Sequence, residues 1–362
     1  MILRLVLLLT MLCPPVLAAT LETSQGPLRL TRVADGFDIP WALGFLPDGS
    51  FLVTERDGRL IYVQDGVKTR IKGLPKVAAD GQGGLLDVLV PRDFTRRREI
   101  FLTFSKRQGR GAGTAVARAF WAAGETRVEN VKVIFEAAPA SATGRHFGSR
   151  LAEAPDGTLY VTLGERGQAE SAQNLGQQQG SVIRINRDGT VPPDNPFIND
   201  RSAKPEIWSY GHRNPQGMAF DAQGRLWAVE HGAKGGDEVN LIQRGRNYGW
   251  PVISYGTHYS GRKIGEGSAR DGMEQPRHYW DPSIAPSGLM VYSGRLWPQW
   301  RGHIFIGSLK FDYISRLSGS TLKEREKLGG PETGRIRDIR EAPDGSIWFA
   351  SETEGAIYRI AP

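Results

Sequence analysis

Residues 154–163 read APDGTLYVTL, a Gly-containing turn followed by alternating apolar and polar residues. This pattern predicts a tight turn that leads into a β-strand. The same phrase recurs three times, as LPDGSFLVTE at 46–55, FDAQGRLWAVE at 220–230 and APDGSIWFAS at 342–351. Two weaker versions are PRDF at 91–94 before IFLTF at 100–104, and WRGH at 300–303 before IFIG at 304–307. A second predicted strand follows each unit, as in GRLIYV at 58–63 and GAIYRI at 355–360.

The repeat predicts an all-β fold, a six-bladed β-propeller of four-stranded antiparallel blades. The six units start roughly 40 to 80 residues apart, and sheets of this size bury both faces by stacking around a ring. We expect a single propeller domain over residues 20–362, with residues 31–37 pairing into the last blade to close the ring. A β-sandwich with coincidental Asp-Gly turns is the alternative, but four near-identical phrases argue against it.

The composition is that of a globular protein with many turns. Gly contributes 45 of the 362 residues, hydrophobic residues 40% and charged residues 23%. The formal net charge of +7 could suit nucleic acid, an anionic surface or an acidic small molecule. The densest basic run is only Arg96-Arg97-Arg98, which we interpret as a solvated turn. We therefore expect no nucleic-acid partner.

The first 19 residues, MILRLVLLLTMLCPPVLAA, have the features of a secretory signal peptide. A basic residue precedes a short apolar run, and small residues end it. No later segment is apolar for long enough to span a membrane, so we expect a soluble periplasmic protein without membrane insertion. The only Cys is Cys13, and Leu12 before it is not the small residue that a lipoprotein signal requires. The mature chain would then contain no disulfide.

Polar residues gather in the glycine-rich segments between the predicted strands, where propeller sites are expected. Gln82 lies in GQGGLLD at 81–87 and His146 in RHFGSRL at 145–151, and a loop His is a possible base. Arg213 and Asn214 lie in YGHRNPQG at 210–217, a pair suited to a carbonyl or carboxylate group. Each motif alone could equally be a plain turn, a solvated His or a hydrogen-bonded corner.

Two further segments could bind ions. The acidic, Gly-rich loop EHGAKGGDEVN at 230–240 leads to NYGWP at 247–251, and such loops can offer oxygen ligands to a hard cation. Arg335 and Arg337 stand two residues apart, so that on a strand both side chains point the same way. Together with Lys310 they could bind several carboxylates, although a solvated strand face is the simpler interpretation. No P-loop, G-x-S-x-G or H-E-x-x-H motif occurs.

Taken in order, these strings resemble the soluble quinoprotein glucose dehydrogenases, and especially their aldose sugar dehydrogenase branch. The resemblance runs from Phe37 to the C-terminus and rests also on IPWALGFLPDG, PSIAPSG, GSLK and GRIRD. It implies a six-bladed propeller that carries pyrroloquinoline quinone (PQQ) and calcium and oxidises the anomeric hydroxyl of aldoses to lactones. It also implies an external electron acceptor. The oligomeric state, monomer or homodimer, stays open.

The resemblance implies roles for individual residues. His146 matches the catalytic base, and Arg213 matches a residue that stabilises the reduced quinone. The expected contacts of the cofactor and substrate are Gln82, Asn214, Lys310, Arg335 and Arg337. The main-chain carbonyls of Gly232 and Ala233 would bind the catalytic calcium, and Glu238 and Tyr248 a second, structural calcium.

Two departures from the glucose-specific enzymes favour a broader range of aldoses. Arg145 stands where those enzymes have an Asp, and His278 and Asp281 stand where they have an aromatic pair, with Trp280 shifted by one place. Two other function classes compete with this assignment. One is a metal-dependent sugar-lactone hydrolase, which would need carboxylate and Asn side chains around a central metal. The other is a non-enzymatic propeller that binds a protein or glycan.

Overall fold

The structure, a computed structural model, describes residues 19–319 and 321–362. It is nearly all β, with six antiparallel sheets that we number as blades 1 to 6. Blade 1 contains β3 (Pro40–Phe45), β4 (Phe51–Glu55), β5 (Arg59–Gln64) and β6 (Val67–Ile71). Blade 2 contains β7 (Leu85–Leu89), β8 (Glu99–Gln108), β9 (Gly111–Phe120) and β10 (Glu129–Glu136). Blade 3 contains β11 (Leu151–Glu153), β12 (Leu159–Thr162), β13 (Ser181–Ile185) and β14 (Ile207–Tyr210).

The second half of the chain repeats this order. Blade 4 contains β15 (Pro215–Phe220), β16 (Leu226–Glu230), β17 (Asp237–Ile242) and β18 (His278–Trp280). Blade 5 contains β19 (Pro286–Val291), β20 (Ile304–Ser308), β21 (Ile314–Ser318) and β22 (Lys323–Leu328). Blade 6 contains β23 (Ile336–Glu341), β24 (Ile347–Ser351), β25 (Ala356–Ala361), β2 (Leu28–Ala34) and β1 (Ala19–Leu21). Each repeated phrase of the sequence therefore forms the turn and second strand of one blade.

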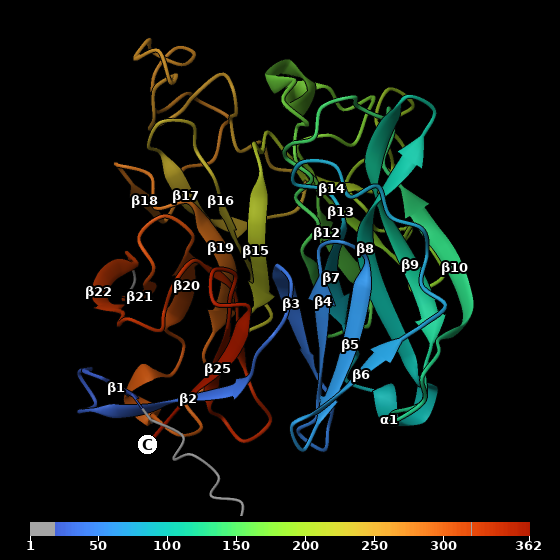
Figure 1. Ribbon diagram of the computed structural model, residues 1–362. Helices are drawn as coiled ribbons and strands as arrows, with labels where there is room; N and C mark the ends of the chain where they lie inside the picture. The colour runs from blue at the N-terminus through green and yellow to red at the C-terminus, as the bar shows by residue number, and fades with distance from the viewer. Residues whose placement is uncertain (1–18, 320) are drawn as a thin grey trace, which may run out of the picture.

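The first strands of the blades line the centre of a closed ring. Strands β3, β7, β11, β15, β19 and β23 each contact the next one, and β23 contacts β3. This circuit confirms the propeller and excludes a β-sandwich. Figure 1 shows the ring obliquely, with the N-terminal β2 in blue beside the C-terminal β25 in red.

The predicted ring closure is confirmed. Strand β2 pairs antiparallel with β25, from Arg29 opposite Ala361 to Ala34 opposite Ile357. Strand β1 then pairs with β2, so that blade 6 has five strands where four were predicted. The predicted signal peptide lies outside the described residues except for Ala19, the first residue of β1.

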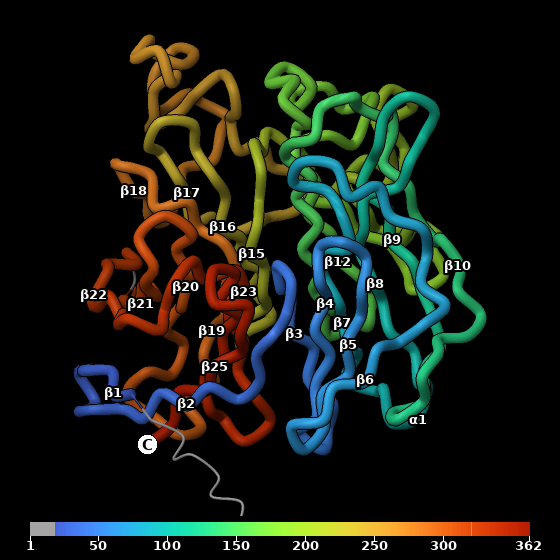
Figure 2. The backbone as a smooth tube through the Cα atoms, in the orientation of Figure 1, coloured from blue at the N-terminus to red at the C-terminus, as the bar shows by residue number. Residues whose placement is uncertain are grey.

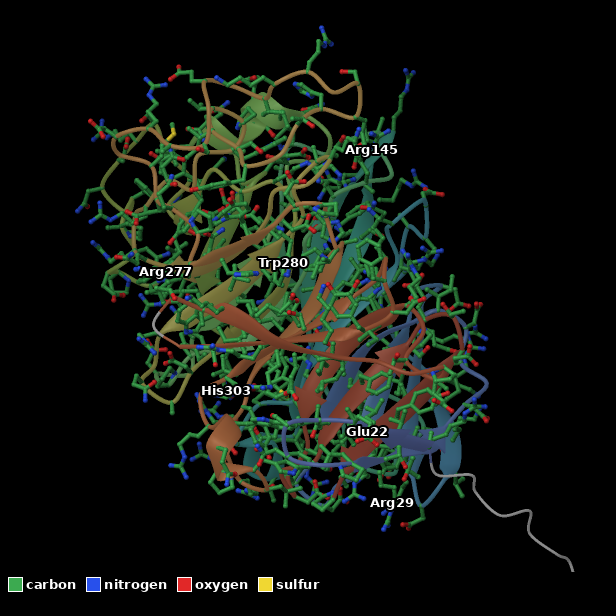
Figure 3. All side chains as sticks on the ribbon, turned by 90° about the vertical axis from the view of Figure 1, so that its left-hand side faces the viewer. Glu22, Arg29, Arg145, Arg277, Trp280 and His303 are labelled. Atoms are coloured by element: carbon green, nitrogen blue, oxygen red, sulfur yellow. The ribbon has the colours of Figure 1, made fainter. Side chains whose placement is uncertain are left out.

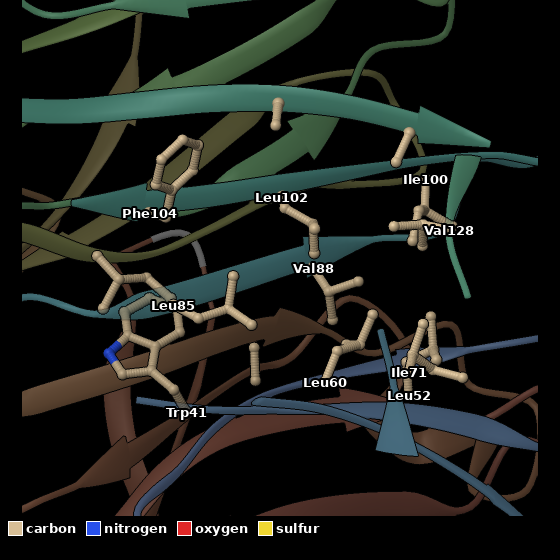
Figure 4. Packing of buried hydrophobic residues seen from close by; sticks show 14 of the residues in the cluster. Trp41, Leu52, Leu60, Ile71, Leu85, Val88, Ile100, Leu102, Phe104 and Val128 are labelled. Carbon is tan, nitrogen blue, oxygen red and sulfur yellow. The ribbon is translucent and has the colours of Figure 1, made fainter. Parts of the chain in front are cut away.

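Hydrophobic clusters between neighbouring blades stabilise the ring. Between blades 1 and 2, side chains of both sheets interdigitate, as Figure 4 shows for Trp41, Leu60, Leu85, Val88 and Phe104. Each of these five side chains is buried. Burial of such a side chain contributes roughly 1.5–3 kcal/mol, which explains how the ring can hold together without disulfides.

Helices are few and short: α1 (Phe94–Arg97) and the 3₁₀ turns η1 (Ala169–Gln173) and η2 (Pro298–Trp300). The basic run predicted as a solvated turn forms α1 and its end, where Arg96 and Arg97 pair with Asp93. No helix of the described residues has the length and apolar character needed to cross a bilayer.

One end of the ring collects the loops that carry the polar motifs, and we call this end the mouth. The start of each first strand pairs with the end of the second strand, as Pro40 does with Glu55 and Pro215 with Glu230. Loops before the first strands and after the second strands therefore meet at the mouth. Figure 3 places Arg145 toward the top of the molecule and Glu22 and Arg29 at its other end. In Figure 2 the segment between β17 and β18 rises above the rest of the chain.

Candidate active site

A cavity lies at the mouth and draws residues from all six blades. It encloses about 570 Å³, counting the part open to solvent. Four of the predicted site residues line it directly: Gln82, Asn214, Arg335 and Arg337. The other lining residues are Trp41, Arg56, Leu86, Phe147, Gly148, Gln216, His231, Leu309 and Glu352. Motifs spread over most of the chain thus converge on one space.

His146 precedes the cavity residues Phe147 and Gly148 and is buried, with 9% of its surface exposed. Its main-chain N–H donates to Gln82 Oε1 at 2.7 Å, which ties two predicted residues together. Its Nδ1 lies 2.7 Å from Glu165 Oε2. An ionised carboxylate only accepts hydrogen bonds, so Nδ1 carries the hydrogen and Nε2 of the neutral ring is left as an acceptor.

The environment keeps His146 neutral. Burial lowers the pKa of His146, and the charges of Arg213 and Arg145 act in the same direction, while the hydrogen bond that Nδ1–H donates to Glu165 opposes them. A neutral, partly buried imidazole with one oriented nitrogen is the form that a general base requires. The arrangement can therefore accept a proton at Nε2.

Glu165 was not predicted from the sequence, although it is central to this geometry. It follows β12 in the loop LGERG at 163–167, is 2% exposed, and also accepts a hydrogen bond from Gly167 N–H. Glu165 could have been predicted from one signal: it is an acidic residue between glycines, directly after the second strand of a blade. Its neighbour Arg166 is likewise buried and was not predicted.

Arg213 and Asn214 connect blades 3 and 4. Asn214 Oδ1 accepts from Gly148 N–H at 3.1 Å. Arg213 N–H donates to Glu230 Oε2 at 2.7 Å, and the guanidinium lies 5.3 Å from the centre of the Trp250 ring. The Nε atom of Arg213 is buried and has no hydrogen-bond partner in the described part of the chain. A donor in this state has capacity for a further ligand.

The cationic side of the cavity contains a carboxylate that the sequence analysis missed. Glu352 Oε2 accepts from Arg337 Nη2 at 2.8 Å, and Glu352 Oε1 lies 3.2 Å from Arg335 Nε. Burial alone would raise the pKa of Glu352, but the charges of Arg337 and Arg335 hold it below its ordinary value. The two Arg side chains point the same way, as predicted, and Glu352 fixes their positions while it reduces their net charge.

Lys310 is placed differently from the two Arg residues. Its side chain is exposed, with the ammonium 4.9 Å from the centre of the Phe311 ring, and it does not line the cavity. Its neighbour Leu309 does, and Leu309 O accepts from Arg335 Nη1 at 2.9 Å. The predicted contact of Lys310 with a cofactor stays a prediction.

His231 is a further cavity residue that the sequence analysis did not single out. Its Nε2 donates to Pro286 O at 2.7 Å. Burial, together with the charge of Arg213, lowers the pKa of His231 to about 3. The ring is therefore neutral in ordinary buffers and serves as a fixed wall rather than as an acid.

A second, smaller pocket beside the cavity holds two carboxylates, those of the buried Glu230 and the half-buried Glu238. Asn240 Nδ2 donates to Glu230 Oε1 at 3.1 Å and to Glu238 Oε2 at 3.2 Å, while Asn240 Oδ1 is buried without a partner among the described residues. Burial, with the charge of Glu230, raises the pKa of Glu238 to about 8. Gly232 and Tyr248 also line this pocket.

These oxygen atoms suit a hard cation, which prefers carboxylate and carbonyl ligands. The phenol of Tyr248 already donates to Leu241 O at 2.6 Å, so a metal there would take its main-chain oxygen. Ala233 is buried but lies outside the lining of this pocket. No group of three or more His, Cys, Asp or Glu side chains suited to a metal occurs in residues 19–319 and 321–362.

The residues that depart from the glucose-specific pattern lie outside the cavity. Trp280 is buried between blades 4 and 5, and its Nε1 donates to Glu324 Oε1 at 3.3 Å. His278 packs edge-on against Trp280, with ring centroids 4.5 Å apart. Figure 3 shows Trp280 in the middle of the molecule, away from Arg145. Arg145 directly precedes His146 in the chain.

Comparison with known proteins places this propeller in a class, the oxidoreductases that act on sugars. A family model described as Glucose / Sorbosone dehydrogenase matches residues 37–359. The aldose sugar dehydrogenase YliI of Escherichia coli K12 is 40% identical, over 96% of both chains. A crystal structure of a glucose dehydrogenase is 42% identical, covers 92% of this chain and 99% of its own, and superposes with a TM-score of 0.89.

The PQQ-bound aldose sugar dehydrogenase of Streptomyces coelicolor is 26% identical, covers 96% of this chain and 99% of its own, and has a TM-score of 0.78. The chain belongs to the Glucose / Sorbosone dehydrogenase family. The predictions of a soluble quinoprotein glucose dehydrogenase-like family and of a sugar dehydrogenase are thereby confirmed.

Proposed function

We propose that the protein is a PQQ- and calcium-dependent aldose sugar dehydrogenase that oxidises the anomeric hydroxyl of aldoses to lactones. The observation that carries this proposal is one cavity, lined by Arg335 and Arg337, that adjoins an oriented neutral His. His146 directly precedes the lining residues Phe147 and Gly148 and is held by Glu165, and Arg335 and Arg337 are held by Glu352. A base beside an anion-binding wall is what oxidation of a sugar by an anionic cofactor requires.

The residues of the cavity fit PQQ, a planar tricarboxylate. Arg335 and Arg337 would bind its carboxylates, with Lys310 as a further cation. Gln82 and Asn214 would offer amide groups, and Arg213, which lines the smaller pocket beside the cavity, its unpartnered Nε–H. PQQ supplies the two-electron acceptor for a hydride from the sugar, and the redox chemistry belongs to this group.

The protein's own part in the reaction is proton transfer and orientation. Nε2 of His146 takes the proton of the anomeric hydroxyl, and Glu165 stabilises the imidazolium that forms. General base assistance of this kind is typically worth 10² to 10⁴ in rate. Arg213, buried beside Trp250, places a fixed positive charge where negative charge develops.

Calcium would be held in the loop that follows β16. The main-chain oxygens of Gly232 and Ala233 would bind the catalytic ion, and Glu238 with the main-chain oxygen of Tyr248 a second one. The carboxylates of the buried Glu230 and the half-buried Glu238, joined by Asn240, support the second site, because a negative charge withdrawn from water is costly without a counter-ion.

The protein would act in the periplasm, exported by the signal peptide in residues 1–19, and would pass electrons to an external acceptor. The substrate class is small-molecule aldoses. We expect a broader range than glucose alone, since Arg145 replaces the Asp of the glucose-specific enzymes.

Reconstitution tests the proposal. The purified protein is incubated with PQQ and calcium, and the reduction of a dye is followed with a panel of aldoses. We expect activity that requires both additions and that His146→Ala nearly abolishes while PQQ binding is retained. Hydrolysis of a sugar lactone without PQQ would instead indicate a lactonase. Sugar binding with neither reaction would indicate a non-enzymatic propeller.

A further inference from the structure

Arg166 is a buried guanidinium that no carboxylate neutralises directly. It is 3% exposed, and no ion pair between it and a carboxylate occurs among the described residues. Burial lowers the pKa of Arg166 to about 10, so it is still protonated at neutral pH. Burial of a charge that no counter-charge neutralises costs free energy. Arg166 also follows Glu165 directly in the chain, which suggests a role near His146.

The guanidinium of Arg166 donates hydrogen bonds to two main-chain oxygens of the loop that carries His146 and to one of β9. Nη1 donates to Arg145 O, and Nη2 donates to Thr143 O at 2.7 Å and to Ala112 O at 3.3 Å. In return, Thr143 Oγ1 donates to Arg166 O at 2.5 Å. Arg166 and the loop are thus joined in both directions: the Arg166 side chain binds carbonyl oxygens of the loop, and a hydroxyl of the loop binds the Arg166 carbonyl oxygen.

The same side chain also contacts the wall of the cavity. Its guanidinium carbon lies 3.4 Å from the centre of the Phe147 ring. Phe147 follows His146 and lines the cavity. Arg166 therefore contacts the residues immediately before and after the base, but not its ring.

The loop needs such a support because its backbone is unfavourable. His146 has φ +56° and Ser149 has φ +85°, values that residues with side chains rarely adopt. Non-Gly residues in this region are strained and persist only where surrounding contacts over-determine them. Without Arg166, the segment around residue 146 would relax toward ordinary backbone angles and turn the imidazole away.

We propose that Arg166 is a positioning residue for the base: Glu165 holds the ring of His146, and Arg166 holds the backbone on which the ring stands. This inference rests on the proposed function for the role of His146 as a base. The placement of the imidazole itself can be tested without turnover.

The first measurement uses the calcium-loaded protein without PQQ. The proton shared between His146 Nδ1 and Glu165 should give a far-downfield imidazole N–H signal in the proton NMR spectrum. Glu165→Gln assigns the signal by removing or shifting it. We expect Arg166→Ala and Arg166→Lys to broaden or lose this signal, because an ammonium cannot reproduce a planar fork of donors.

The second measurement is turnover of the reconstituted enzyme. A misplacement of about 1 Å in a reacting group can cost 10²-fold in rate, so we expect kcat to fall about 10- to 100-fold in Arg166→Lys. The affinity for PQQ should stay within about threefold, because Arg166 touches none of the groups assigned to PQQ. Added methylguanidinium should restore both the NMR signal and kcat in Arg166→Ala.

Arg184→Ala is the matched control. Arg184 is also a buried Arg of blade 3, but it pairs with Asp156 and Asp194 and packs on Trp208. Its removal should lower thermal stability and leave the His146 signal in place. An unchanged signal and unchanged kcat in Arg166→Lys would overturn the proposal. The proposal would also be overturned if Arg166→Ala and Arg184→Ala changed the His146 N–H signal equally and methylguanidinium did not restore it. If the wild type oxidises no sugar, the proposed function fails, while the NMR measurement still decides the placement.

Discussion

Replacing Glu165 with Gln removes one negative charge and keeps the shape of the side chain. The new Oε1 can still accept from Gly167 N–H and from His146 Nδ1–H, the two bonds that Glu165 Oε2 accepts now. The tautomer of His146 and its orientation should therefore survive. What is lost is the charge that stabilises the imidazolium when Nε2 takes a proton.

The size of the effect follows from the strength of that bond. A net hydrogen bond is worth about 1 kcal/mol, and one to a charged group about 1.5–3 kcal/mol. The difference of about 1–2 kcal/mol corresponds to a roughly 5- to 30-fold lower kcat. The hydrogen bond from His146 Nδ1–H to Glu165 acts to raise the pKa of His146, so its weakening lowers that pKa. Because the base must be neutral, the acidic limb of kcat/KM should move to lower pH.

The assay is dye-linked aldose oxidation by the reconstituted enzyme across the pH range. Glu153→Gln serves as the control, since Glu153 is a buried carboxylate at the far end of β11 that pairs with Arg187. Glu153→Gln should leave the acidic limb of kcat/KM at the same pH. An acidic limb that stays fixed or moves to higher pH in Glu165→Gln would refute the assignment of His146 as the base oriented by Glu165.

Four further outcomes are expected. Arg337→Ala should weaken PQQ binding about 10- to 150-fold, from the loss of a charged hydrogen bond, in an equilibrium titration; unchanged affinity would remove it from the cofactor site. The calcium-free protein should lose thermal stability as the pH rises from 4.5, the ordinary pKa of Glu238, toward 8, its pKa in the folded protein, because the folded state binds the Glu238 proton more tightly. Calcium or Glu238→Gln should flatten this dependence of melting temperature on pH, and a flat dependence in the calcium-free wild type would contradict the raised pKa of Glu238. Gly84→Ala should lower the free energy of unfolding by about 2–4 kcal/mol, since the added Cβ would lie 1.8 Å from Arg56 O. A melting temperature near that of the wild type would show that the segments around Gly84 and Arg56 separate easily. Leu30→Ala should lower the free energy of unfolding by about 2–5 kcal/mol, because the buried Leu30 lies in β2, which pairs with β25 and closes the ring. Arg29→Ala, at the adjacent exposed position, should leave it almost unchanged.

The fold could be predicted because its signals are local. Each blade repeats a Gly turn and an alternating strand, and six such units leave few ways to bury the sheets. The fifth strand of blade 6 was missed because Ala19–Leu21 is short and falls at the end of a stretch with a different expected role.

The site was predictable only where a residue lies in a distinctive motif. Gln82, Asn214, Arg335 and Arg337 do, and they line one cavity. Glu165 and Glu352 do not, because each is an ordinary acid in a loop until the ring brings it to a His or to an Arg pair. Their partners lie 19 and 15 residues away in the chain, at spacings that no secondary structure relates.

The most direct test of the central claim is a titration of the calcium-loaded apoprotein with PQQ, followed by the absorbance of the ligand. We predict one PQQ per chain, and clearly weaker binding by Arg337→Ala than by His146→Ala. Absence of binding, or equal affinity of the wild type and Arg337→Ala, would contradict the assignment of the mouth cavity to this cofactor.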